Sequence, residues 1–412
     1  MSRVECAAPP EVSEILAPLA TGTRFPRSAR ILFAAGEVSG DHHASHLARA
    51  ILRLAPDARL FGAGGPLMSR AGIDVHIPTS HLGCVGLQES ARFARPLYRA
   101  LWRIKDLIDE ERPHAAVLVD NEGFNLMLAR ALNRRGIPII FYFPPQVWLW
   151  GRWRARAVAR LARLIIAAFP DEAEVYRRHG GRVALLGHPL VDLLNPDGDG
   201  RPSPETPDSR MVALMPGSRI QEIERLAGPM LEAAKIVLAS HPDTEIILPV
   251  AAPHLLGRVK AAIARSHMES RVRLIERDSY THLARCSVVL MSSGTATLEA
   301  ALMGVPMVVA YRVSPVTYWL GRCLTHVRHI AMPNILLRET VVPELLQGDV
   351  RPTRLAEEVL RLLEDPRRAD AARRNLGRVR PLLGQPGAIT RAATAILDEV
   401  RDTAAIPAGS GS

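Results

Sequence analysis

Ser287-Val-Val-Leu-Met-Ser-Ser-Gly-Thr-Ala-Thr-Leu-Glu299 is the stretch that decides the fold of this chain. Its apolar first half predicts a buried strand, and the residues from Ala296 onward have the spacing of a helix. At the turn between them, backbone N–H groups and the positive end of the helix converge, which suits a phosphate or diphosphate. Glu299, in the first helical turn, has two acceptor oxygens for the vicinal hydroxyls of a ribose. The alternative is an ordinary strand-to-helix turn capped by Thr295 or Thr297.

The same alternation of strand and helix runs along most of the chain. Apolar runs that predict strands lie at 31–35, 60–63, 115–119, 137–143, 164–169 and 183–186, and again at 211–215, 245–250, 272–275, 288–291 and 307–311. Strands that alternate with helices predict a parallel sheet covered on both faces. The fold class is therefore α/β, with two Rossmann-like parallel-sheet domains that face a cleft.

The domain boundaries follow from length and composition. A chain of 412 residues suits two domains of ordinary size. Residues 29–192 are expected to form the first domain and residues 211–402 the second, joined by the Pro-, Gly- and Asp-rich linker 193–210. The ends, 1–28 and 403–412, are expected to be disordered, and the first of them has no signal-peptide pattern.

The bulk composition excludes several classes of protein. Cys6, Cys84, Cys286 and Cys323 are scattered, so neither a zinc cluster nor a disulfide framework is predicted, and a reducing cytoplasm fits. The sequence has no run of 18 apolar residues, so no membrane-spanning helix is expected. The protein is therefore expected to be soluble or to lie on a surface.

The net charge of +10 is concentrated in two short stretches. Residues 88–105 have five basic residues and one acid, a net +4, and residues 148–163 have five arginines and no acid. Residues 91–108 include Phe93, Tyr98 and Trp102 in an amphipathic pattern with a basic flank, and Trp148, Trp150 and Trp153 accompany the second stretch. This pattern favours an anionic membrane surface over nucleic acid. The alternative is a solvated helix packed on the core.

Two further loops follow predicted strands. Pro216-Gly-Ser-Arg219 comes directly after the strand 211–215, where Gly217 permits close approach and Arg219 can pair with phosphate oxygens; the alternative is a simple Pro-Gly turn. Gly36-Glu-Val-Ser-Gly-Asp41 is the corresponding loop of the first half. No nucleophile-elbow motif surrounds its serine, which favours a capping role over a nucleophilic one.

Metal binding is the weaker interpretation at two places. Asp197-Gly-Asp199 lies in the linker, and Asp-Gly is a common turn dipeptide. His42 and His46 share one helix face but lack the H-E-x-x-H arrangement. An arginine and helix ends can neutralise a leaving diphosphate, so no metal and no cofactor are expected.

Eight blocks of sequence resemble the lipid-A-disaccharide synthase family in identity and order. They are Ala35 to Asp41, Tyr142 to Trp150, Gly187 to Pro189, Leu214 to Arg219, Ser293 to Glu299, Pro306 to Arg312, Pro333 to Leu337 and Pro343 to Gln347. The resemblance spans residues 29–400. It implies a GT-B-type, inverting, metal-independent glycosyltransferase of lipid A biosynthesis, which joins UDP-2,3-diacylglucosamine to 2,3-diacylglucosamine 1-phosphate by a β(1→6) link. It also implies a peripheral position on the cytoplasmic face of the inner membrane of a Gram-negative-type bacterium.

The resemblance also implies roles for individual residues. Asp120, directly after the strand 115–119, is the general base for the acceptor 6-hydroxyl; the alternative is a helix cap. Glu37 and Asp41 are further catalytic candidates on the acceptor side, Arg219 and the loop 293–297 stabilise the departing UDP, and Glu299 holds its ribose. The substrate-binding residues implied in this way are Ser39, Gly40, Asn125, Gly217, Ser218, Arg219, Glu222, Ser293, Gly294, Thr295, Ala296, Thr297, Glu299 and Asn334.

The chain departs from the family pattern mainly on the acceptor side. It has Asp120-Asn-Glu-Gly-Phe-Asn125 where the family has Asp-x-Pro-Asp-Phe-Asn, which makes Glu122 a second candidate base. Two other functions therefore stay open. One is a related glycosyltransferase or a UDP-sugar epimerase with a different acceptor, and the other is a catalytically silent protein that binds lipid. Whether the chain forms a homodimer also stays open.

Overall fold

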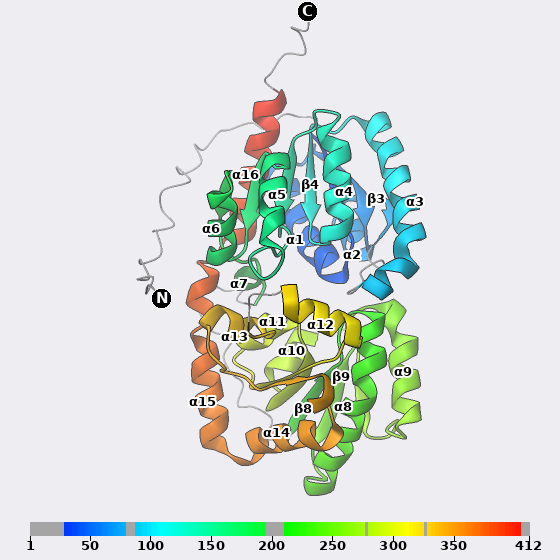
Figure 1. The fold of residues 1–412 in the computed structure, drawn as a ribbon, viewed down its shortest axis with the longest axis vertical. Helices are drawn as coiled ribbons and strands as arrows, with labels where there is room; N and C mark the ends of the chain where they lie inside the picture. The colour runs from blue at the N-terminus through cyan, green and yellow to red at the C-terminus, as the bar shows by residue number, and fades with distance from the viewer. Residues whose placement is uncertain (1–28, 80–86, 195–209, 277–278, 325–327, 405–412) are drawn as a thin grey trace, which may run out of the picture. The chain divides into compact units, whose positions relative to one another are not determined.

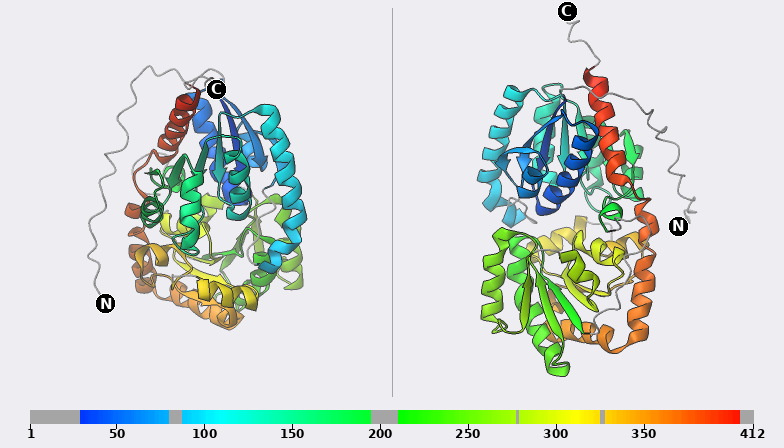
Figure 2. Two further views of the ribbon diagram at one scale, coloured as in Figure 1. Left: turned by 45° about the horizontal axis from the view of Figure 1, so that its top comes forward. Right: turned by 180° about the vertical axis from the view of Figure 1, so that it is seen from behind.

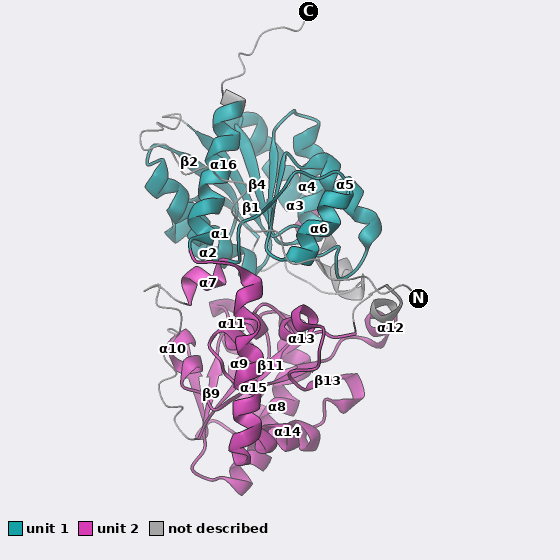
Figure 3. Ribbon diagram, turned by 90° about the vertical axis from the view of Figure 1, so that its left-hand side faces the viewer, with its two compact units in different colours: residues 1–79, 99–188, 387–412 teal, residues 80–98, 189–386 magenta. Residues whose placement is uncertain are grey.

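The computed structural model describes residues 29–79, 87–194, 210–276, 279–324 and 328–404, and it contains two compact units (Figure 1, Figure 3). Unit 1 comprises residues 1–79, 99–188 and 387–412, and unit 2 comprises residues 80–98 and 189–386. The ends predicted to be disordered, 1–28 and 405–412, and most of the predicted linker lie outside the described residues.

Unit 1 is built on a seven-stranded parallel sheet in the order β3-β2-β1-β4-β5-β6-β7. The strands are β1 (Arg30–Ala35), β2 (Arg59–Gly64), β3 (Asp74–Pro78), β4 (Ala115–Val119), β5 (Ile139–Tyr142), β6 (Leu164–Ala167) and β7 (Val183–Leu185). The central strands are apolar and buried along their length, as parallel strands covered on both faces must be. The six strands predicted in this half are confirmed, and β3 is a seventh strand that the sequence analysis did not predict.

Helices cover both faces of this sheet. They are α1 (Val38–Leu54), α2 (Pro66–Arg70), α3 (Leu87–Glu111), of which residues 99–111 belong to this unit, α4 (Glu122–Asn133), α5 (Ala155–Leu161), α6 (Pro170–Arg178) and α16 (Ala388–Ala404). Helices α4 and α5 lie on the face seen in Figure 1, and α1 and α16 pack together on the face seen from behind in Figure 2. A short 3-10 turn, η2 (Arg152–Arg154), precedes α5.

Unit 2 has a six-stranded parallel sheet in the order β10-β9-β8-β11-β12-β13. The strands are β8 (Met211–Met215), β9 (Glu245–Pro249), β10 (Val272–Ile275), β11 (Val288–Ser292), β12 (Met307–Tyr311) and β13 (Glu344–Leu346). The helices are α7 (Leu190–Leu193), α8 (Ile220–Ser240), α9 (Leu256–Arg265), α10 (Ser279–Ala284), α11 (Ala296–Leu302), α12 (Pro315–Leu324), α13 (Met332–Leu337), α14 (Pro352–Glu364) and α15 (Pro366–Gly377), with 3-10 turns η3 (Pro253–Leu255), η4 (Gln347–Asp349) and η5 (Arg380–Leu383). Its core joins the buried faces of α8, α9 and α14 to the sheet.

The strand order reverses once in each sheet. In unit 1 the chain places β2 and β3 on one side of β1 and β4 to β7 on the other, and in unit 2 the same reversal falls between β8 and β11. Ligands of open α/β sheets bind beyond the carboxyl ends of the strands at such a switch point. The loops that begin at Gly36 and Asp120 in unit 1, and at Pro216 and Ser293 in unit 2, occupy these positions.

The C-terminal helix corrects the predicted domain boundary. Residues 211–402 were expected to form one domain, but α16 belongs to unit 1 and packs on α1. Glu399, which is buried on α16, forms ion pairs with Arg163, at 2.9 Å, and with Arg182. The guanidinium of Arg391 donates to the carbonyl of Leu186 at 3.1 and 2.8 Å. These contacts join residues more than 200 positions apart, and sequence periodicity carries no information about them.

Candidate functional site

In unit 2, the carboxylate of Glu222 shapes the loop between β8 and α8. Its Oε2 accepts the backbone N–H groups of Ser218, at 2.9 Å, and Arg219, at 3.2 Å, and its Oε1 accepts the Arg219 guanidinium at 2.9 Å. Glu222, at the third position of α8, thus accepts the backbone N–H of the N-cap residue Arg219, which is one half of a capping box. Gly217 has φ +128, and a side chain there would collide with the Glu222 carboxylate. Glu222, expected to bind substrate, therefore holds the loop and the guanidinium of Arg219 in place.

Hydroxyl groups tie the neighbouring loop, between β11 and α11, to the segment before α13. Ser293 Oγ donates to the carbonyl of Ile330 at 2.7 Å, and Thr297 Oγ1 donates to the carbonyl of Gly294 at 2.7 Å and accepts the N–H of Met332 at 3.2 Å. Gly294 is exposed, and a Cβ built on it would meet no atom within 4 Å. The loop is thus anchored through its hydroxyls and open at its glycine.

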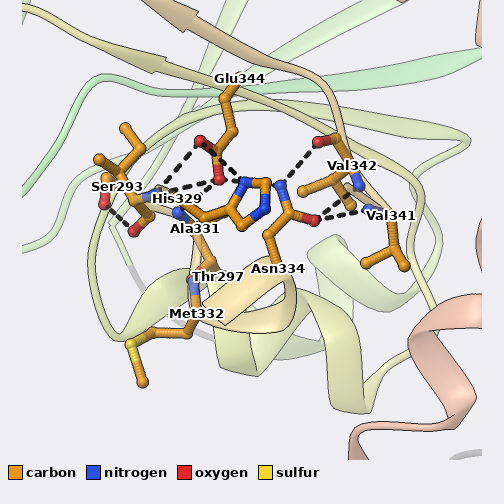
Figure 4. A network of polar contacts seen from close by, with 10 residues as sticks. Ser293, Thr297, His329, Ala331, Met332, Asn334, Val341, Val342 and Glu344 are labelled. Carbon is orange, nitrogen blue, oxygen red and sulfur yellow. Dashed lines mark hydrogen bonds and ion pairs between the residues drawn. The ribbon is translucent and has the colours of Figure 1, made fainter. Parts of the chain in front are cut away.

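Asn334 and Glu344 form the centre of that anchorage, shown in Figure 4. The Asn334 amide nitrogen donates to the carbonyl of Val342 at 2.9 Å and to Glu344 at 2.8 Å, and its oxygen accepts the N–H groups of Val341 and Val342 at 2.8 and 2.9 Å. Glu344 also accepts the N–H groups of Ile330 and Ala331 at 3.1 and 2.9 Å. A carboxamide has two N–H donors and two acceptor lone pairs, so these four bonds use the full capacity of Asn334. The geometry gives it a structural task in place of the expected contact with substrate.

Glu299 lies in the first turn of α11, and as a whole residue it is half-buried. Tyr280, on α10, donates its hydroxyl to Glu299 Oε1 at 3.1 Å. Burial raises the pKa of Glu299 to about 7, and the hydrogen bond from Tyr280 opposes that rise. The carboxyl therefore changes charge near neutral pH, where a ribose would require it as an acceptor.

In unit 1, Asp120 begins the loop beyond β4. Asp120 and Asn121 both have left-handed backbone conformations, with φ of +53 and +39, which are uncommon for residues with side chains. Asn121 then caps α4 by accepting the N–H of Phe124 at 3.2 Å. Ser39 Oγ, on α1, donates to Asp120 Oδ2 at 2.7 Å. The structure thus brings the predicted base and a predicted acceptor-side residue together across the switch point of this sheet.

Small and amide side chains support this arrangement. A Cβ on Gly40 would lie 3.3 Å from the carbonyl oxygen of Val119 and 3.4 Å from the Asp120 Cβ, so a larger residue would push α1 away from β4. Asn125 is fully buried, and its amide nitrogen donates to the carbonyls of Asp120 and Val119 at 2.6 and 3.1 Å. Gly40 therefore permits the close approach of α1 to β4, and Asn125 holds the end of β4. Their expected contacts with substrate stay predictions.

Of the two other catalytic candidates, Asp41 has a structural set of contacts. It is 3% exposed, and its oxygens accept the N–H groups of Gly65, Leu67 and Met68 at 3.1, 3.1 and 2.9 Å, which caps α2. Burial raises its pKa and these three bonds lower it. Glu37 is the N-cap residue of α1, in extended conformation and without a side-chain capping bond, and it begins this helix in the loop after β1.

Glu122, the second candidate base, forms an ion pair with Arg154. The Arg154 guanidinium stacks over the Trp150 ring at 3.9 Å and lies 5.7 Å from the centre of the Trp153 ring. Burial lowers the pKa of Arg154. The charge of Glu122 is therefore matched within unit 1, whereas Asp120 receives a neutral hydroxyl.

The sequence analysis missed a buried acid near Asp120. Glu172 is fully buried on α6, and its Oε2 accepts the N–H of Ala168 at 2.8 Å. Burial raises its pKa to about 8, and the charge of Asp120 contributes in the same direction. Glu172 is thus protonated at neutral pH. Its signal in the sequence is the block Phe169-Pro-Asp-Glu172, in which an acid comes three residues after the end of the predicted strand 164–169.

The histidines of α1 do not form a metal cluster in the part of the chain that the structure describes. His42 and His46 face each other with 3.3 Å between their Nε2 atoms, and burial lowers the pKa of both, that of His46 to about 4. His43 is buried and stacks on Phe143 at 4.3 Å. Asp197 and Asp199 lie outside the described residues.

Some of the residues expected to contact the membrane are exposed, and one is buried. Tyr98 and Trp102 on α3 are 59% and 50% exposed, and Trp150 and Trp153 are 38% and 66% exposed. Trp148 was expected among them, but it is buried; its indole N–H donates to Gln146 at 2.8 Å. The side chain of Phe93 lies outside the described residues. No helix within the described ranges is long and apolar enough to cross a bilayer.

Two parallel-sheet units of this kind, each with loops gathered at its switch point, have the GT-B fold. Solved structures of similar fold include a UDP-GlcNAc 2-epimerase from Neisseria meningitidis bound to UDP-GlcNAc, at 14% identity and a TM-score of 0.58 over 90% of this chain and 98% of that one. Another is CalG4, the calicheamicin glycosyltransferase, at 16% identity and a TM-score of 0.54 over 91% and 99%.

Within that fold class the chain belongs to the lipid-A-disaccharide synthetase family, whose model matches residues 31–395. The lipid-A-disaccharide synthase of Geobacter sulfurreducens is 38% identical over 90% of this chain and 97% of its own length. That of Myxococcus xanthus is 35% identical over 90% and 97%. The resemblance noted in the sequence and the predicted fold class are confirmed.

Proposed function

We propose that this protein transfers 2,3-diacylglucosamine from UDP to the 6-hydroxyl of 2,3-diacylglucosamine 1-phosphate, with inversion at the anomeric carbon and release of UDP. Membership of the family supports the reaction class. The observation that carries the proposal is the Asp120 carboxylate, placed immediately beyond β4 at the switch point of unit 1 and held through one oxygen by Ser39.

Unit 2 is assigned the UDP-sugar. Arg219 and the backbone of the loop 293–297 would neutralise the diphosphate, because both lie beyond the neighbouring strands β8 and β11. Glu299 would accept the ribose hydroxyls. Positive charge from Arg219 and from the start of α11 stabilises the leaving group, so the proposed mechanism routes no step through a metal.

Unit 1 is assigned the acceptor and the base. Ser39 occupies Asp120 Oδ2, and Oδ1 takes the proton of the acceptor 6-hydroxyl as its oxygen attacks the anomeric carbon. The bond from that carbon to the diphosphate oxygen breaks on the opposite side, and both of its electrons leave with UDP. One displacement on the side opposite the leaving group converts an α-linked donor into a β-linked product.

We also propose that the protein lies on an anionic membrane surface, where acylated substrates are found. Exposed Trp102 lies beside Lys105, at 4.6 Å, and exposed Trp150 and Trp153 lie beside Arg154. Aromatic rings next to basic groups are typical of interfacial contacts. For a Gram-negative-type bacterium this surface would be the cytoplasmic face of the inner membrane.

Mass spectrometry of the products tests the reaction. Purified protein with both acylated substrates should yield the tetraacylated disaccharide 1-phosphate, and Asp120→Asn should yield little of it under the same conditions. Absence of the disaccharide with the active wild-type protein, together with a converted UDP-sugar, would favour the epimerase alternative. If neither the disaccharide nor a converted UDP-sugar is formed, the alternative of a catalytically silent lipid-binding protein is favoured.

A further inference from the structure

Tyr280 has no role in the function proposed above, yet its hydroxyl reaches the carboxylate assigned to the ribose. It lies on α10, which precedes β11, whereas Glu299 lies on α11, which follows β11. The hydroxyl donates to Glu299 Oε1 at 3.1 Å. This hydrogen bond therefore links the two helices that flank the strand at the predicted nucleotide site.

We propose that Tyr280 is a positioning residue for the nucleotide, whose hydroxyl orients the Glu299 carboxylate so that it accepts the vicinal hydroxyls of the ribose. The inference rests on the proposed donor role of unit 2. An ionised carboxylate has about four acceptor positions, so the tyrosine uses one and leaves the others for the ligand. A carboxylate fixed by a hydrogen bond loses less freedom when the ligand arrives.

The same bond affects the charge of Glu299. Burial favours the protonated carboxyl, and a hydroxyl that donates to it favours the carboxylate. Ribose hydroxyls donate most strongly to the charged form. Among the described residues, Tyr280 is the titratable group that shifts the pKa of Glu299, and its hydrogen bond lowers that pKa. The tyrosine hydroxyl itself stays protonated because burial raises its own pKa. Removal of the hydroxyl therefore raises the pKa of Glu299 further.

Calorimetric titration of the full-length protein with two ligands tests this inference. UDP has both ribose hydroxyls, and 2′,3′-dideoxy-UDP has neither. Tyr280→Phe should weaken UDP about tenfold, as expected for a hydrogen bond to a charged group. It should change the affinity for the dideoxy nucleotide less than about twofold, since that ligand makes no use of the carboxylate. Equal weakening of both ligands, or an unchanged affinity for UDP, would overturn the inference.

A pH series adds a readout that a merely structural tyrosine would not move. The affinity for UDP should rise with pH as Glu299 ionises, and the midpoint should lie at higher pH in Tyr280→Phe than in the wild type. The titration of UDP itself is common to both proteins and cancels in the comparison. Tyr318→Phe, the same change on α12 at a half-buried tyrosine against Trp319, is the matched control and should reproduce the wild-type curve. A midpoint in Tyr280→Phe that coincides with this control overturns the inference.

Glu299→Gln separates this inference from the proposed function. If Glu299→Gln binds UDP as tightly as the wild type, the ribose role of Glu299 fails, and the positioning role fails with it. If Glu299→Gln loses affinity for UDP but not for the dideoxy nucleotide while Tyr280→Phe matches the wild type, only the positioning role of Tyr280 is wrong.

Discussion

Asp120→Asn should remove most of the turnover and leave the fold and the binding of UDP intact. Asparagine matches aspartate in size and tolerates the left-handed backbone at this position, where φ is +53. Its carboxamide oxygen can still accept the hydroxyl of Ser39, which donates to Asp120 at 2.7 Å. The variant therefore changes one property, because a carboxamide cannot take the proton of the acceptor hydroxyl.

The size of the effect follows from that single loss. General-base catalysis contributes about 10²- to 10⁴-fold, so the barrier should rise by roughly 3–5 kcal/mol. Glu122→Gln is the matched comparison, because it makes the same chemical change two residues away. Glu122 already forms an ion pair with Arg154, so replacing the Glu122 carboxylate should lower turnover less than about tenfold.

Steady-state rates and calorimetric titration with UDP, measured on both variants side by side, provide the assay. UDP affinity should stay within about twofold of the wild type in both, because the donor residues belong to unit 2. A near-normal rate in Asp120→Asn together with an inactive Glu122→Gln would show that the wrong carboxylate was assigned as the base.

Three further predictions concern the diphosphate, the buried acid and the membrane. Arg219→Ala should lower kcat/KM by an amount that corresponds to a loss of about 2–4 kcal/mol of transition-state stabilisation. EDTA should leave the wild-type rate unchanged, and a loss of activity in EDTA that Mg²⁺ restores would contradict the metal-free mechanism. In the folded protein burial raises the pKa of Glu172 from 4.5 to about 8. Between these two values the folded state binds more protons than the unfolded state, so stability to urea should fall as pH rises from about 5 to 8. Glu172→Gln should flatten that dependence, and a wild-type stability that is constant over this range would refute the assignment. Trp153→Glu should reduce flotation with anionic liposomes, whereas Trp153→Phe should float like the wild type; equal recovery of all three proteins with neutral and anionic vesicles would refute the membrane contact.

The sequence predicted the central strands well because they are continuous apolar runs bounded by turn residues. Such runs are typical of parallel strands that are covered on both faces. It missed β3 and β13 for the opposite reason. Both lie at sheet edges, β3 is mostly exposed, and β13 has only three residues. The placement of α16 in unit 1 was also beyond reach, since it depends on ion pairs of Glu399 with distant arginines.

For the candidate site, the sequence located the loops but not the partners of their side chains. Ser39 and Asp120 lie 81 residues apart, and only the strand order brings them together. Asn334 was expected to contact substrate because motif position says nothing about the four hydrogen bonds that use its amide. Tyr280 belongs to no motif, so only its distance to Glu299 identifies it.

The central claim, an inverting transfer to an acylated acceptor, is tested most directly by NMR of one reaction mixture in EDTA. Phosphorus spectra follow UDP and its sugar, and proton spectra follow the new anomeric centre. The account predicts that UDP appears in step with loss of the donor, only when 2,3-diacylglucosamine 1-phosphate is present, and that the new linkage has the large vicinal coupling of a β-glucoside. Donor that isomerises or releases UDP without the acceptor, or a product with an α-linkage, would contradict it.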